Sequence, residues 1–171
     1  MLDTNTNVTR VISGPKTYTK QDHEQIVCGP EKMITVPPRH YCVVRNPVVV
    51  DDEGRPAQDA YGQFRLRHGD SEIRMVDRYP DPFPLYPGEI CASAPTELSI
   101  VKQNTCVKLR ALRPFFDEQA SVQREAGDEW HFGPGTLIPR VEVEEVELIR
   151  AHVVTHNQAL RLVALKKCTD W

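Results

Sequence analysis

The chain has 171 residues, of which 40% are hydrophobic, and a formal net charge of −3 at pH 7. This length is enough to bury a core, either as one ordinary domain or as a few small modules. The slightly acidic balance, with basic residues scattered among acidic ones, gives no electrostatic reason to expect nucleic acid as a partner. No apolar stretch approaches the ~20 residues that cross a bilayer, so no membrane association is expected.

Proline is the residue type that first constrains the fold. The chain holds 14 prolines against 9 glycines, spread from Pro15 to Pro139. Because proline lacks a backbone donor and fixes φ, it is kept out of helix interiors and central strands. Long helices are therefore not expected.

The cysteines are spread along the chain without close pairs. Five occur, at positions 28, 42, 91, 106 and 168. The first residues, Met1–Asn5, are polar and lack the basic start and apolar run of a secretory signal. We therefore expect reduced thiols in an intracellular, cytoplasmic protein, with Cys42 and Cys106 packed as small buried hydrophobes.

Several segments alternate between apolar and polar residues with a period of two. The clearest is Val107–Arg113, in which valine, leucine and alanine share one face and the basic side chains share the other. The same pattern occurs in Gly62–Arg67 and begins in Leu160–Ala164. Such alternation predicts antiparallel strands with one face toward water.

Acidic turns separate the predicted strands. Asp51–Gly54 and Asp117–Gly127 are expected to be loops that return the chain antiparallel to itself. A further strand is expected at Val141–Leu148, where glutamates alternate with valines. The adjacent pair Glu144 and Glu145 reverses this alternation and predicts a β-bulge.

The sequence repeats itself. Asn104–Leu112 resembles Asn157–Leu165, and Asn157 follows Asn104 by the same 53 residues that separate Asp170 from Asp117. His40–Val48 is an earlier and looser copy. A constant spacing between similar segments indicates a tandem array of one supersecondary unit.

A second repeated element supports this interpretation. Gly14–Tyr18 resembles Gly133–Leu137, and each is followed within a few residues by an acidic and apolar segment. We predict an all-β fold, a tandem array of small antiparallel β modules of roughly 53–60 residues each. Modules of this size bury too little surface to be stable alone, so they are expected to stack on their neighbours.

Residues that resemble catalytic or metal-binding groups are better explained structurally. His152 and His156 have the spacing of two ligands on a helix, but in the expected strand they lie about 13 Å apart, too far to share a zinc ion. Asp51–Gly54 lacks the alternating acids and the distant glutamate of a calcium loop. Cys42 near His40 has no third group to orient a nucleophile. No catalytic, cofactor or metal site is predicted, and the chain is not expected to be an enzyme.

One face qualifies as a candidate protein-interaction surface. Lys108, Arg110 and Arg161 project from the outward side of predicted strands in two copies of the repeat. The alternative to a purely structural role is therefore a β-sheet binding module that docks a cargo or signalling partner on this face. The face has no interleaved aromatic residues for stacking bases, which disfavours direct contact with RNA.

Several longer motifs resemble the repeats of the major vault protein family, and the likeness covers nearly the whole chain. They are Val36–Cys42, Asp81–Glu89, Ala126–Trp130, Gly133–Arg140, Glu142–Glu144 and Asn157–Leu162. The residues that carry this repeat signature are Pro37, Pro38, His40, Tyr41, Pro87, Gly88, Gly127, Asp128, Trp130, Gly133, Pro134, Pro139 and Asn157.

The resemblance implies a division of the chain into four vault repeats. The expected ranges are 1–39, without its opening strand, 40–97, 98–150, and 151–171, which is the start of a fourth repeat and ends within a hairpin. The extra length of the second repeat is expected at 70–95. Leu137 stands where the first copy of its motif has Tyr18, a departure from the repeat.

The resemblance also implies a function. Proteins of this family form the shell of the vault ribonucleoprotein particle, with many copies side by side like barrel staves and the N-terminal repeats near the waist. The expected role is thus a self-associating structural subunit, with scaffold or transport roles, in the cytoplasm and possibly also the nucleus. The expected partners are further copies of the chain, the vault poly(ADP-ribose) polymerase, the telomerase-associated protein and, indirectly, vault RNA.

Overall fold

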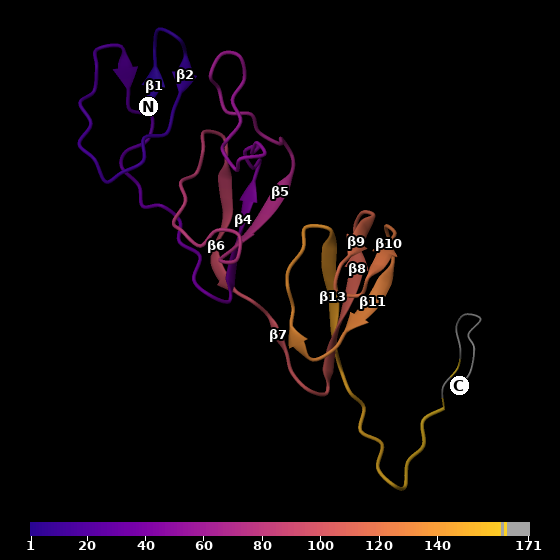
Figure 1. Ribbon diagram of the computed structural model, residues 1–171. Helices are drawn as coiled ribbons and strands as arrows, with labels where there is room; N and C mark the ends of the chain where they lie inside the picture. Colours follow the sequence, from indigo (N-terminus) through magenta and orange to yellow (C-terminus); the bar gives the residue numbers. More distant parts are fainter. Residues whose placement is uncertain (162, 164–171) are drawn as a thin grey trace.

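The computed structural model describes residues 1–161 and 163. These residues contain strands and turns but no helix, and all strand pairs are antiparallel, so the predicted all-β array is confirmed. Figure 1 shows the sheets following one another along the chain as three separate groups. No part of the described chain forms a helix long and apolar enough to cross a membrane.

The first group of strands is small. Its three strands are joined in the order β2-β1-β3, and each is two residues long. Their bounds are β1 Leu2–Asp3, β2 Val8–Thr9 and β3 Glu24–Gln25.

The second group is a three-stranded sheet in which β4 (His40–Arg45) lies between β5 (Ser71–Met75) and β6 (Ile90–Glu97). Cys42 and Val44 on β4 are fully buried. They form the core together with the buried side chains of Val36 and Phe83. The alternation along β4 thus produces one buried face, as a half-covered antiparallel sheet requires.

The third group repeats this arrangement. Its central strand β8 (Thr105–Ala111) lies between β11 (Glu129–Phe132) and β13 (Val143–Arg150). Val107 and Leu109 on β8 are buried together with two residues outside the sheet, Val101 and Leu137. The remaining strands are β7 Ile100–Val101, which pairs with β12 Gly135–Thr136, and the hairpin of β9 Phe115–Asp117 and β10 Val122–Arg124.

Matching hydrogen bonds show that the second and third sheets are copies of one unit. The turn before β4 is closed by the His40 N–H donating to the Pro37 carbonyl, and the turn before β8 by Thr105 donating to Lys102. Arg39 and Asn104, at the same place in these turns, both have φ of 62°. A third turn of this kind, Thr155–Gln158, lies at the predicted 53-residue spacing.

This equivalence shifts the sequence comparison by one residue. Counted from the two turns, the fully buried Cys42 corresponds to buried Val107, whereas the similarity of the sequences aligns it with Cys106. Cys106 is only half-buried, so the prediction that it packs like Cys42 is wrong. The alternation of a strand sends neighbouring side chains to opposite faces, and a shift of one residue therefore exchanges inside for outside.

The strands of each sheet lie within one of the expected module ranges, whose boundaries remain a prediction. Two residues from the range expected for the first module, 1–39, contact the second sheet instead. Ile34 forms a bridge with Phe83, and Val36 packs in the second core. In the third module Ser99 corresponds to Ile34, because its carbonyl accepts a hydrogen bond from the Leu137 N–H. Val101 corresponds to Val36, because it is buried in the core.

Most of the additional residues of the second module lie ahead of the range in which they were expected. The Asn46 N–H donates to the Asp70 carbonyl, and the Ala111 N–H donates in the same way to the Asp128 carbonyl. The segment between Asn46 and Asp70 is longer than the segment between Ala111 and Asp128. The larger insertion therefore occupies 47–69, ahead of the expected range of 70–95. In this insertion the predicted strand Gly62–Arg67 forms isolated bridges, with Phe64 and Leu66 half-buried, instead of a continuous strand.

Most predicted strands and turns of the third module are found. The strand predicted at 141–148 is β13, and its register shifts between Glu145 and Glu147, which confirms the predicted bulge. The range Asp117–Gly127 is more ordered than a simple loop, because it contains most of the β9–β10 hairpin.

The segment that follows β13 contains no strand among its described residues. His152 and His156 lie in extended chain and a turn, so the prediction of a strand there is wrong. Of the strand predicted at Leu160–Ala164, the described residues 160, 161 and 163 are not in a strand, and the rest lies outside the described residues, as do Cys168 and Asp170.

Candidate interaction surfaces

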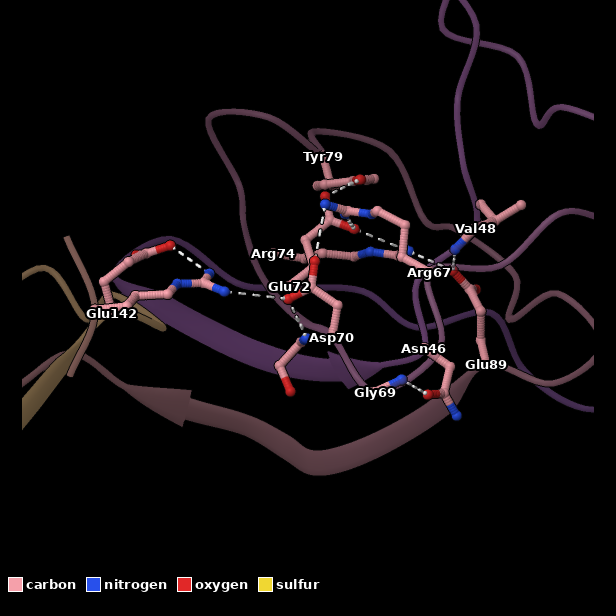
Figure 2. Close-up of polar contacts among 12 residues, drawn as sticks. Asn46, Val48, Arg67, Gly69, Asp70, Glu72, Arg74, Tyr79, Glu89 and Glu142 are labelled. Atoms are coloured by element: carbon pink, nitrogen blue, oxygen red, sulfur yellow. Dashed lines mark hydrogen bonds and ion pairs between the residues drawn. The ribbon is translucent and has the colours of Figure 1, made fainter. Parts of the chain in front are cut away.

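A buried ion pair holds the second module together. Arg74 on β5 and Glu89 before β6 have side chains that are 3% and 0% exposed, and their closest atoms lie 2.6 Å apart. The carboxylate of Glu89 also accepts the backbone N–H of Val48 at 2.8 Å and of Tyr86 at 2.9 Å. Figure 2 shows the Glu89 carboxylate beside the backbone nitrogen of Val48. Both oxygens are thus satisfied, as a buried charge requires.

The guanidinium of Arg74 lies between a carboxylate and two aromatic rings. It stands 5.0 Å from the ring centroid of Tyr79 and 4.9 Å from that of Phe83. Burial disfavours its charge, but the hydrogen bond and the negative charge of Glu89 outweigh this and raise the pKa of Arg74. The Tyr79 hydroxyl donates to Glu72 at 3.0 Å, and burial raises its pKa.

The first module holds an acid in the same place. Glu24 is buried, accepts the Gln21 N–H at 2.9 Å and pairs with Arg10. The Tyr18 hydroxyl donates to this carboxylate at 2.5 Å. The hydrogen bond from Tyr18, that from Gln21 and the charge of Arg10 together lower the pKa of Glu24. Gln21–Glu24 and Tyr86–Glu89 are therefore copies of one acid-binding turn.

In the third module the buried acid occupies a different position. The turn Arg140–Val143 closes in the same way, but Val143 stands in the place of Glu89. The buried acid is Asp117 on β9, with arginine nitrogens of Arg124 and Arg140 at 3.6 and 3.8 Å. These arginines cover the rings of Trp130 and Phe115, at 4.5 and 5.5 Å from the ring centroids.

One charged residue lies at the joint between the second and third modules. Arg113, which follows β8, pairs with Glu142 at 2.6 Å and approaches Asp70 of the second module at 3.9 Å. Asp70 in turn lies 3.2 Å from Arg67 (Figure 2). The hydrogen bond and charge of Glu142 raise the pKa of Arg113. The side chain is about half exposed, so this contact orients the modules more than it stabilises them.

The predicted basic face is largely neutralised within its own sheet. Lys108 and Arg110 share one face of β8, and both bind Glu129 of β11, at 2.6 and 2.9 Å. Hydrogen bonds from these two residues lower the pKa of Glu129. Arg161, the third member of this candidate face, lies beyond β13 in exposed chain outside the sheet. The structure brings the first two together and does not place the third with them in one sheet.

A groove runs along the free side of the third module. It lies between β7 and β13, has a volume of about 490 Å³, and is lined by apolar and charged side chains. Ile100 and Leu148 at this groove are 51% and 59% exposed. Large apolar side chains gathered at a groove are a common mark of a binding surface. The sequence pattern of β13 places its glutamates and valines but gives no sign of the groove, because β7 is distant in sequence.

The residues of the repeat signature lie mainly in turns and at strand entries. Pro37, Pro38, His40 and Tyr41 form the entry to β4, Pro87 and Gly88 the turn before Glu89, Gly127 and Asp128 the turn into β11, Gly133 and Pro134 the link to β12, and Asn157 the last turn. Trp130 and Pro139 line the space under the β9–β10 hairpin. These residues place the strands.

Gly88 shows why the turn before Glu89 restricts its residues. Its φ is +93°, and a Cβ at this position would come within 2.4 Å of the Leu66 side chain. Only glycine adopts this conformation without strain and leaves room for Leu66. The turn can therefore bring Glu89 under Arg74.

The residues considered for chemistry are held by structural contacts. Burial raises the pKa of the Cys42 thiol to about 11, which disfavours the reactive thiolate. The His40 ring contacts the Pro38 carbonyl at 2.9 Å. Asp51 accepts the N–H groups of Glu53 and Arg55 in an ordinary turn. Within the described residues there is no group of three side chains that could hold a metal ion.

Comparison with known proteins agrees with this architecture. Two models, both described as the major vault protein repeat domain, match residues 33–93 and 99–140, together more than half of the chain. The chain belongs to the major vault protein family. It is 54% identical to the major vault protein of Diplobatis ommata and 53% identical to that of Homo sapiens, in both cases over 99% of the chain. It is 51% identical to major vault protein alpha of Dictyostelium discoideum.

The match covers only part of these relatives. The chain spans 20% of the length of the Diplobatis ommata protein and 19% of the human one. The first match begins at residue 33, close to the bridge between Ile34 and Phe83 that opens the second sheet.

Proposed function

We propose that this chain is a wall segment of the vault shell, in which identical copies stand side by side and the stacked β modules form the wall near the waist. The observation that carries the proposal is the repetition of one sheet along the chain, with β5-β4-β6 followed by β11-β8-β13. An array of this kind extends along one axis and presents the same edges at each step, which suits lateral packing of identical copies.

The strand edges support lateral contact. In both larger sheets the central strand is covered on both sides, while β5, β6, β11 and β13 are edge strands. Edge strands offer unpaired backbone groups to a neighbour. Many weak contacts of this sort, repeated along several modules, add up to a firm association even where each is weak alone.

A structural and non-catalytic role fits the chemistry of the buried groups. Glu24, Glu89 and Asp117 are each bound by arginine from within their own module. Acids that serve catalysis are usually held ready for a substrate in a cleft, with a pKa tuned to that task. The buried acids of this chain join strands to loops instead.

The partners inferred from the resemblance belong to the same proposal. These are other copies of the chain, the vault poly(ADP-ribose) polymerase, the telomerase-associated protein and vault RNA, in the cytoplasm and nucleus. Docking of a cargo on Lys108 and Arg110 gains no support, because Glu129 already occupies these side chains.

Sedimentation velocity tests the self-association of the wild-type chain. We expect the weight-average sedimentation coefficient to rise with protein concentration, and the rise to weaken at high salt, because exposed charges lie beside the edges. A chain that remains monomeric at every concentration, with its β-sheet circular dichroism intact, would contradict the proposal.

A further inference from the structure

The groove between β7 and β13 has the features of a docking site for a protruding apolar residue. Its walls include Ile100 and Leu148, which are more than half exposed, and Val146, which is 39% exposed. Its floor includes the buried side chains of Val101 and Val107. The groove therefore reaches from the surface to the core of the third module, and filling it would remove exposed apolar surface from water.

A matching protrusion lies at the other edge of the same module. The β9–β10 hairpin contacts β11, where the Phe115 ring lies 6.1 Å from that of Trp130. Figure 1 shows β10 and β11 on one side of β8 and β13 on the other. Phe116 on this hairpin is 56% exposed and lies opposite Gln123, on the face turned away from the buried Asp117.

The hairpin is held firmly enough to present this ring. Its inner face carries Asp117 and Arg124, which bind each other across the two strands, and Arg124 lies over Trp130. Arg140 covers Phe115 and approaches the Phe116 carbonyl at 3.5 Å. An anchor that is already ordered loses little conformational entropy on binding.

Charged side chains lie beside both surfaces. The groove is lined by Lys102 and Arg150 and also by Glu145 and Glu147; all four are exposed, and none forms an ion pair within the described chain. Glu118 and Glu125 flank the strands of the hairpin, are also exposed and are likewise free of ion pairs within residues 1–161. The two basic residues of the groove can meet the two glutamates of the hairpin, and such pairs at the rim of an apolar contact fix its orientation.

We propose that the occupant of this groove is a second copy of the chain, with Phe116 of one copy inserted between β7 and β13 of the next. The contact is head-to-tail, since each copy carries the groove at one edge and the hairpin at the other. Contacts of this type continue from copy to copy and close into a ring when the rotation between copies allows it. This inference rests on the proposed function and assigns a surface to it.

Two single substitutions separate the halves of the contact. Phe116→Asp removes the protrusion and leaves the groove intact, and Leu148→Asp disables the groove and leaves the hairpin intact. Each variant alone is expected to associate more weakly by roughly tenfold or more, the loss typical of a central apolar anchor. Tyr61→Asp, at an 82% exposed residue of the second module, is the matched control and is expected to associate like wild type.

Mixing the two variants distinguishes a head-to-tail contact from a symmetric one. A Leu148→Asp copy can still insert its Phe116 into the intact groove of a Phe116→Asp copy, so the equimolar mixture is expected to form dimers and stop there. The milder variants Phe116→Ser and Leu148→Ser, checked by circular dichroism, repeat the test if an aspartate disturbs folding.

The outcomes separate this inference from the proposed function. Wild-type protein that associates while both variants associate equally well would overturn the head-to-tail contact and leave the shell proposal intact. Loss of association in Leu148→Asp alone would also overturn it, because the groove would then bind something other than the hairpin. Wild-type protein that never associates contradicts both.

Discussion

The second and third modules share a strand order but fill equivalent positions with opposite chemistry. Arg74 pairs with Cys42 across the second sheet, as Phe132 pairs with Val107 across the third. Glu89 and Val143 end equivalent turns. The second module thus joins its sheet to its loop with a buried ion pair, and the third module uses apolar packing. The fold requires a side-chain contact at this point, but this contact can be ionic or apolar.

The comparison also shows what a buried ion pair contributes. Removal of its charges from water opposes most of the attraction between them, so such a pair adds little net stability but is very costly to break. Arg74 and Glu89 have no alternative partners of equal quality once separated, and they therefore specify one arrangement of the long second-module loops. The third module has shorter connections and reaches the same sheet with side-chain packing.

The largest expected effect comes from breaking the ion pair on one side. Glu89→Val leaves the guanidinium of Arg74 buried without its partner and removes the acceptor of the Val48 N–H. We expect the second module to lose about 3–5 kcal/mol of stability. Native-state hydrogen exchange of the β4 amides measures this loss, and the β8 amides of the third module serve as the internal control.

The double variant Arg74→Phe/Glu89→Val decides whether the charge is responsible. It places the third-module side chains into the second module, and we expect β4 protection to recover most of the way, short of wild type because Val48 and Tyr86 lose their acceptor. A double variant as unstable as Glu89→Val would show that packing around Glu89, and not the unpaired charge of Arg74, caused the loss.

The next largest effect concerns the third module. Leu109 is 4% exposed at the centre of its core, and Leu109→Ala is expected to cost about 2–5 kcal/mol through lost burial and a cavity. Exchange should accelerate at β8 and remain unchanged at β4. Equal acceleration in both modules would mean that the modules unfold as one cooperative unit, against the modular interpretation.

Alkaline pH should weaken the second module more than the third. The pKa of Cys42 is raised to about 11 in the folded chain, from a reference value of 9.0. The unfolded thiol therefore ionises first, and the stability it contributes is complete below pH 9 and lost as the pH rises toward 11. The loss is at most about 2–3 kcal/mol.

Urea unfolding followed by circular dichroism measures this pH effect. The difference in midpoint between wild type and Cys42→Ala, which has no thiol to titrate, should shrink as the pH rises from 9 to 11. Cys42→Ala is less stable at neutral pH because it leaves a small cavity. A midpoint difference that stays constant with pH would contradict the assignment.

The smallest effect is expected at the exposed face of the third sheet. Glu129 binds Lys108 and Arg110, and its folded pKa is lowered. Its contribution is therefore present above its unfolded pKa and is lost as the pH falls through the lower folded value. Because these side chains are exposed, Glu129→Gln should change β11 exchange only slightly, and less still at high salt. A large, salt-independent loss would indicate a buried pair.

The sequence predicts some of these features and not others, for physical reasons. The alternation of β8 identifies its buried face because one side of that strand meets water. In β5, by contrast, Arg74 stands between the apolar residues Ile73 and Met75, and this alternation predicts that Arg74 faces water. Its burial depends on Glu89, brought near by a turn that requires Gly88, and no local pattern contains that information.

The interaction surfaces show the same division. Lys108 and Arg110 were predicted on one face of a strand and lie there, but their neutralisation by Glu129 depends on the pairing of β8 with β11. The groove depends on β7 approaching β13. A single strand's pattern predicts which way its side chains point, whereas the partners they meet are fixed by the assembled sheet.

Small-angle scattering of dilute wild-type protein tests most directly the central claim that the chain is an array of equivalent modules. The account predicts a radius of gyration clearly above the ~16 Å expected for a compact domain of this length, with a long tail in the distance distribution. A compact, symmetric distribution would contradict it.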